Sequence, residues 1–131
     1  MAPHLDNLGD LELAVLQYVW REGPSDVKTV HAALGPEREI SHNTVQSALK
    51  RLYEKELLTR HKDGHAYVYS PRLDREEVTE RRVAEVVEQL ADGELDVALT
   101  AFVNFAERAG DETLERLEAL VARRKCDDGE E

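Results

Sequence analysis

The chain has 131 residues and a hydrophobic composition of 41%, enough for one ordinary domain or a small domain with an extension. It contains no apolar run long enough to cross a membrane, and its N-terminal sequence lacks the features of a signal peptide. We therefore expect a cytoplasmic protein with no direct membrane association. The single Cys126 excludes an intramolecular disulfide and a cysteine-rich metal cluster, and we predict no metal site and no cofactor.

The formal net charge of -11 argues at first against a nucleic-acid partner. The charge is unevenly distributed, however. Residues 1–72 hold nine Lys and Arg against ten Asp and Glu, a net charge of -1, together with all five histidines. Residues 73–131 hold eight Lys and Arg against eighteen Asp and Glu, a net charge of -10. The first part of the chain therefore remains compatible with binding DNA.

Two short amphipathic helices are expected first. Periodic apolar residues predict a helix over residues 8–22, which Gly23-Pro24 ends. Ser25 would cap a second short helix, which Gly35-Pro36 would end. The apolar stripes of the two helices are Leu8, Leu11, Val15 and Val19 in the first, and Val27, Val30 and Leu34 in the second.

The stretch from Ile40 to Leu58 predicts a third helix with an unusual polar face. Ser41 is a good N-cap, and Ile40 and Val45 can pack across it as a hydrophobic staple. The apolar stripe of this helix is Val45, Ala48, Leu49, Leu52 and Tyr53. The opposite face carries small hydrogen-bonding side chains and then two cations: His42, Asn43, Thr44, Gln46, Ser47, Lys50 and Arg51.

This polar face favours a DNA-recognition helix. Asn, Gln, Ser and Thr are mediocre helix formers, so their concentration here needs a reason. Asn and Gln can pair bidentately with adenine, Thr can contact the thymine methyl group, and Lys and Arg can bind guanine or phosphate. A solvated amphipathic helix is the alternative that this segment alone leaves open.

A hairpin is expected after the third helix. Residues 57–62 and 66–70 have strand-like patterns on either side of Asp63-Gly64, a dipeptide that favours a tight turn. Three short helices followed by one hairpin make a winged helix-turn-helix, in which Lys62 and His65 would lie at the wing tip near phosphate. Pro71 closes the second strand and marks the expected domain boundary.

The remaining chain is predicted to be helical, with apolar stripes interrupted at Asp92-Gly93 and at Gly110. None of these helices could bury its apolar face alone. They could pack back on the first domain, but a dimer interface is the better prediction because two-fold DNA sites suit two-fold proteins. The residues expected at that interface are Val83, Val87, Leu90, Leu99, Phe102, Leu117 and Leu120.

The predicted fold is therefore mainly α, of α+β character: a winged helix-turn-helix with a C-terminal helical dimerisation region. The expected parts are a DNA-binding domain over residues 1–72, a dimerisation domain over 73–125 and a frayed acidic tail over 126–131. The sequence has no nucleophile elbow, phosphate-binding glycine loop or zinc-protease helix. We predict that the protein is not an enzyme.

With these segments laid out, the chain resembles the penicillinase-repressor (BlaI/MecI) family of bacterial transcriptional regulators from about Leu8 to Lys125. Three motifs carry the resemblance: L-x3-E-x2-V-x4-W from Leu8, S-x2-T-V-x3-L-x-R-L from Ser41, and K-D-G-H-A-Y-V-Y from Lys62. The resemblance implies a homodimeric repressor that binds a palindromic operator and blocks transcription.

The resemblance also implies a release mechanism. In well-known members a membrane-bound sensor protease responds to β-lactam and leads to cleavage of an Asn-Phe bond in the dimerisation region. This chain has Asn104-Phe105 at the matching place, although Phe105 could equally be a core residue beside an incidental Asn. Some relatives sense copper through paired C-terminal cysteines, which Cys126 alone cannot supply.

The sequence leads to one main functional hypothesis and two alternatives. The main hypothesis is a dimeric operator-binding repressor without catalytic residues. The alternatives are a winged-helix module that binds another protein through its acidic surface, and a repressor controlled by a small ligand without cleavage. The expected DNA-binding residues are Ser41, His42, Asn43, Thr44, Gln46, Ser47, Lys50, Arg51, Lys62 and His65.

Overall fold

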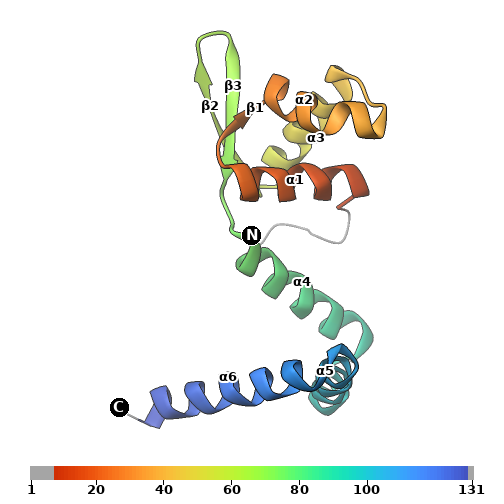
Figure 1. Ribbon diagram of the computed structural model, residues 1–131, viewed down its shortest axis with the longest axis vertical. Helices are drawn as coiled ribbons and strands as arrows, with labels where there is room; N and C mark the ends of the chain where they lie inside the picture. Colours follow the sequence, from red (N-terminus) through yellow and green to blue (C-terminus); the bar gives the residue numbers. More distant parts are fainter. Residues whose placement is uncertain (1–7, 130–131) are drawn as a thin grey trace. The chain divides into compact units, whose positions relative to one another are not determined.

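The computed structural model describes residues 8–129 and divides the chain into two compact units, the first ending at Glu85 and the second beginning at Val86. Figure 1 shows a mainly helical chain with one small antiparallel sheet, which confirms the predicted fold class. The elements in chain order are α1 (Asp10–Glu22), β1 (Ser25–Asp26), α2 (Val27–Arg38), α3 (His42–Glu54), β2 (Leu58–Asp63), β3 (Ala66–Pro71), α4 (Arg75–Leu90), α5 (Leu95–Ala109) and α6 (Asp111–Gly129).

The core of the first unit lies between α1, α2, α3 and the sheet. The apolar stripe predicted for the third helix is confirmed at four positions, all completely buried: Val45, Ala48, Leu49 and Leu52. Val15, Leu16 and Val19 of α1 pack in the same cluster. Tyr53 is the exception, because its side chain is exposed and its ring stacks against a guanidinium. The prediction that Tyr53 belongs to the apolar stripe that packs in the core is therefore wrong.

The limits of α2 differ from those predicted. Asp26 rather than Ser25 is the N-cap, and Ser25 lies in a short strand that the sequence pattern missed. The helix also continues through Gly35-Pro36 to Arg38 and ends where Glu39 adopts a left-handed conformation. A Cβ atom at Gly35 would lie 2.6 Å from the His31 ring. The glycine thus makes room for that ring and does not end the helix.

The third helix begins as predicted and ends earlier. Ser41 is its N-cap, but the helix stops at Glu54, four residues before the expected end. Glu56 has a positive φ of 65°, which turns the chain so that Leu57 and Leu58 enter the core and Leu58 begins β2. The two leucines are therefore buried as part of a turn and a strand.

The predicted hairpin is confirmed as β2 and β3. Gly64 takes a positive φ of 66° in the turn between the strands, a conformation that glycine adopts without strain. The sheet order is β1-β3-β2, and the register pairs Arg60 with Tyr69 and Lys62 with Tyr67. Paired residues of an antiparallel ladder point to the same face, so two cations and two tyrosines share one face of the wing.

The second unit comprises the end of α4 together with α5 and α6. Its buried residues within the described chain are small: Ala91, Ala98 and Ala106. The helix α6 continues through Cys126, so the expectation that residues 126–131 are frayed is wrong for those up to Gly129, while 130–131 lie outside the described residues. No described helix is both long enough and apolar enough to cross a membrane.

Candidate nucleic-acid interface

The start of α3 is fixed by a side-chain cap. The Ser41 hydroxyl accepts a hydrogen bond from the Thr44 amide at 3.2 Å and lies 3.0 Å from the Thr44 hydroxyl. This cap satisfies one of the free amides in the first helical turn. The two hydroxyls are thus already within hydrogen-bond distance of each other.

The exposed row of α3 runs opposite its buried row. Val45, Leu49 and Leu52 are separated by steps of four and three residues, and Asn43, Ser47 and Lys50 repeat the same steps on the other side. All ten side chains predicted to bind DNA are exposed: Ser41, His42, Asn43, Thr44, Gln46, Ser47, Lys50, Arg51, Lys62 and His65.

A groove separates one flank of α3 from the wing. It brings together four of the predicted residues, His42 and Gln46 from α3 with Lys62 and His65 from the hairpin. Lys28 at the start of α2 also lines this groove and was missed by the sequence analysis. Nothing in the sequence around Lys28 indicates that the start of α2 lies beside α3 and the wing.

Arg60 joins the wing to α3 and is a second residue that the sequence analysis left out of the site. Its guanidinium carbon lies 4.1 Å from the centre of the Tyr53 ring and 4.2 Å from that of Tyr67. A side-chain hydrogen bond with Tyr69 is the main factor that raises the pKa of Arg60. The stack places a permanent positive charge beside Tyr67, one of the residues that line the groove.

Glu12 of α1 has a structural role that the sequence analysis did not predict. This carboxylate is 7% exposed and accepts hydrogen bonds from two cations of the α3 region, Arg51 Nε at 3.0 Å and Lys55 Nζ at 2.5 Å. Arg51 therefore lies on the flank of α3 that faces α1, away from the groove. Its side chain is still half exposed, which leaves part of the guanidinium accessible.

The turn between α2 and α3 is organised by a pair of histidines. The rings of His31 and His42 meet edge to face with centroids 5.9 Å apart, and His31 Nε2 lies 3.1 Å from the Ile40 carbonyl oxygen. This contact holds the residue before the Ser41 cap. His42 is thus positioned by packing at one end of the groove.

Asp26 supplies the only carboxylate lining the groove among the described residues. Its Oδ1 accepts the Thr29 amide at 2.8 Å and caps α2. Hydrogen bonds from the Thr29 side chain and backbone lower the pKa of Asp26 below its usual 3.8. The carboxylate is therefore committed to the helix terminus, where a negative charge is favourable.

The residues predicted for cleavage and dimerisation lie on the C-terminal helices. Asn104 and Phe105 are inside α5, and the Phe105 side chain is 64% exposed, so the alternative that it is a core residue is wrong for this chain. Val87 and Leu117 are partly buried. The other predicted interface residues are exposed: Val83, Leu90, Leu99, Phe102 and Leu120.

Comparison with known sequences identifies the family. The sequence model described as penicillinase repressor matches residues 8–123. The chain belongs to the penicillinase repressor family. The chain is 34% identical over 119 residues to the transcriptional regulator BlaI of Mycobacterium tuberculosis, covering 90% of this chain and 85% of BlaI. It is 26% identical over 116 residues to the penicillinase repressor of Bacillus licheniformis, covering 88% of this chain and 91% of that repressor.

A solved structure of a BlaI DNA-binding domain matches part of the chain. The solution structure of the DNA binding domain of the repressor BlaI has a TM-score of 0.52 and 30% identity, covering 59% of this chain and 93% of that domain. The family resemblance expected from the three sequence motifs is thus confirmed. The relatives are repressors, a class of proteins without enzymatic activity.

Proposed function

We propose that this protein is a sequence-specific DNA-binding transcriptional repressor. The observation that carries the proposal is the surface of the first unit, where uncharged hydrogen-bonding side chains on α3 lie beside the cations of the wing. The similarity to the BlaI DNA-binding domain supports the same function. A surface used only for solubility would carry mixed charges and would not need this concentration of Asn, Gln and Ser.

The proposed contacts divide into two classes. Asn43, Gln46 and Ser47 are short or amide side chains that would contact base edges in the major groove. Lys50 and Lys62 would bind phosphates on either side and fix the register of the protein. We add Lys28, which lines the groove, and Arg60, which stacks on the groove residue Tyr67, to the phosphate-facing group.

The proposed repressor acts as a homodimer on a palindromic operator. The second unit exposes large apolar side chains, including Leu99 at 52% and Leu120 at 56%, while burying mainly alanines. Surface of this kind is costly in water and is typical of interfaces. A dimer would place two copies of α3 on two half-sites. Once one copy is bound, the link between the protomers raises the effective concentration of the other copy at its half-site.

The proposed release mechanism is cleavage between Asn104 and Phe105 by a membrane-bound sensor protease that responds to β-lactam. The bond lies inside α5, so its backbone must unwind locally before a protease can bind it. Cleavage would separate α6 and the last five residues of α5 from the rest of the chain. The dimer would then lose much of its apolar surface, and operator affinity would fall.

Selection from random-sequence DNA followed by sequencing, repeated over a series of salt concentrations, tests the DNA-binding function. We expect a short palindrome to be enriched, with affinity that falls steeply as salt increases. Failure of a folded dimer to enrich any sequence would contradict the proposal and would favour a winged-helix module that binds protein.

The Asn104→Ala variant tests the release mechanism in cells that carry the sensor. Derepression should be lost while operator binding is retained, because residue 104 is outside the first unit. A matched Asn43→Ala variant should instead weaken operator binding and leave cleavage intact. Normal derepression of Asn104→Ala would contradict cleavage at this bond and would favour control by a small ligand.

A further inference from the structure

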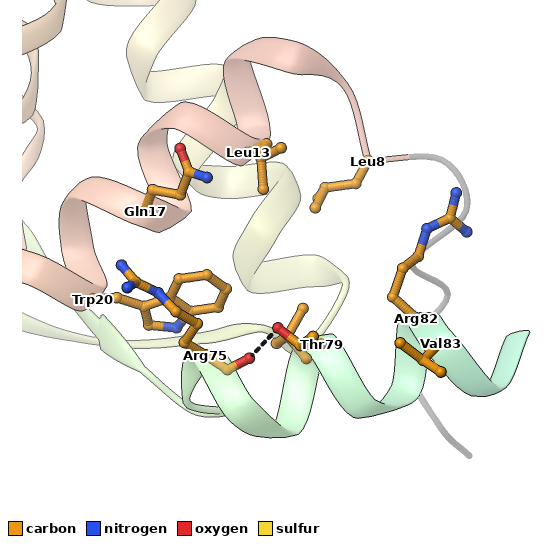
Figure 2. A pocket seen from close by; sticks show the side chains of 9 residues that line it. Leu8, Leu13, Gln17, Trp20, Arg75, Thr79, Arg82 and Val83 are labelled. Atoms are coloured by element: carbon orange, nitrogen blue, oxygen red, sulfur yellow. Dashed lines mark hydrogen bonds between the residues drawn. The ribbon is translucent and has the colours of Figure 1, made fainter. Parts of the chain in front are cut away.

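A cleft in the first unit lies away from the proposed DNA-binding surface, between α1 and the first turns of α4. Figure 2 shows Leu13, Gln17 and Trp20 of α1 facing Arg75 and Thr79 of α4. The α1 residues follow steps of four and three, and Arg75, Val78, Thr79 and Arg82 recur at three- and four-residue steps on α4. Two helix faces thus line one concave surface.

The walls of this cleft are mainly apolar. Val78 is buried and Trp20 is partly buried, whereas Leu13 and Val83 remain exposed although they line a concavity. The Trp20 indole N–H donates to the Leu73 carbonyl oxygen at 2.9 Å, which fixes the plane of the ring. A rigid aromatic ring beside exposed aliphatic side chains is suited to a flat apolar ligand.

The charge of the cleft is opposite to that of the chain. Two arginines and no Asp or Glu line it, in a protein whose formal net charge is -11. Arg82 pairs with Glu85 at 3.3 Å. Arg75 makes no ion pair with any residue of the described chain, and its guanidinium carbon lies 5.7 Å from the centre of the Trp20 ring. A cation beside an aromatic wall can bind the acidic group of a ligand whose ring lies on the same wall.

We propose that this cleft is a binding site for a small aromatic carboxylate. The ring system would lie against Trp20, Leu13 and Val78, and the carboxylate would accept hydrogen bonds from Arg75. The Thr79 hydroxyl donates to the Arg75 carbonyl oxygen at 2.7 Å, so this residue holds the first turn of α4 in place. Binding at this site is independent of the DNA-binding function proposed above.

Titration of the full-length protein, observed by nuclear magnetic resonance, tests the site. Trp20 is the only tryptophan in the sequence, so its indole N–H gives one resonance that reports on the cleft. The probes are 2-naphthoate and the uncharged 2-naphthamide, which have the same ring and similar shape. We expect 2-naphthoate to shift the indole resonance saturably, and 2-naphthamide to bind about tenfold more weakly because it lacks the charge-assisted hydrogen bonds.

Three variants test whether Arg75 binds the carboxylate of 2-naphthoate. Arg75→Gln should weaken 2-naphthoate binding about tenfold and leave 2-naphthamide unchanged. Arg75→Lys should retain part of the affinity, and Arg108→Gln, an exposed arginine of α5, should retain all of it. No shift of the indole resonance at millimolar 2-naphthoate would overturn the proposal. Equal affinity for the two probes, or an unchanged affinity in Arg75→Gln, would also overturn it.

Discussion

Neutralising Glu12 should destabilise the first unit although this residue lies outside the proposed DNA-binding surface. Its nearly buried carboxylate holds Arg51 at 3.0 Å and Lys55 at 2.5 Å, and so joins α1 to the C-terminal part of the α3 region. The Glu12→Gln variant keeps the shape of the side chain and removes its charge. The two cations then face an amide that can accept only one of their hydrogen bonds well.

The size of the effect follows from the exposure of the partners. Removing one member of a fully buried ion pair costs about 3–5 kcal/mol because the remaining charge is buried without a partner. Here the side chains of Arg51 and Lys55 are 49% and 22% exposed, so both can regain water. We therefore expect a loss of about 1–3 kcal/mol in the free energy of unfolding.

Urea unfolding monitored by Trp20 fluorescence measures this loss, because the only tryptophan lies in the first unit. Glu22→Gln is a matched control on the same helix, since its pair with Arg21 is exposed and should contribute less than about 1 kcal/mol. The transition midpoint of Glu12→Gln should fall well below that of Glu22→Gln, with the slope unchanged. Equal midpoints for the two variants would refute the role assigned to Glu12.

The remaining predictions concern the proposed DNA-binding surface, the α2 cap and the proposed dimer. Gln46→Ala should cost about 1–3 kcal/mol at one base position, and a uniform loss over all sequences would contradict base contact. Arg51→Ala should lower the salt slope of DNA binding by about one unit for each phosphate it neutralises, and an unchanged slope would assign Arg51 to the Glu12 pair alone. Asp26→Ala should lower stability by about 1 kcal/mol through loss of the cap. The lowered pKa of Asp26 means that its contribution is present above about pH 4 and is lost as the pH falls through the folded pKa, so wild type and variant should converge in urea unfolding at low pH. Phe102→Ser should shift a dimer toward monomer in sedimentation, whereas an unchanged mass would exclude Phe102 from the interface.

Local signals in the sequence predicted much of the first unit. The Ser41 cap and the three- and four-residue spacing of Val45, Ala48 and Leu49 depend on neighbours within one or two helical turns, so α3 could be placed from them. The Asp63-Gly64 turn fixed the hairpin in the same way. These features need no knowledge of tertiary packing.

Features that depend on distant partners could not be predicted. Glu12 lies at helical spacing from Leu8, Val15 and Val19, but its partner Arg51 is 39 positions away, so the sequence does not reveal the ion pair. The stack of Arg60 on the Tyr53 ring is a contact between a strand and a helix, which the spacing within the helix cannot show. Gly35 looked like a helix terminus because its real role, making room for the His31 ring, is visible only in three dimensions.

The salt dependence of operator binding in a Lys50→Gln/Lys62→Gln variant tests the proposed DNA-binding surface most directly. Both side chains are exposed in the first unit, and Lys125→Gln on α6 is the matched control. A dimer that loses two phosphate contacts per protomer should lose roughly 3–4 units of slope in log affinity against log salt concentration. The same slope in wild type, control and double variant would contradict the placement of DNA on α3 and the wing.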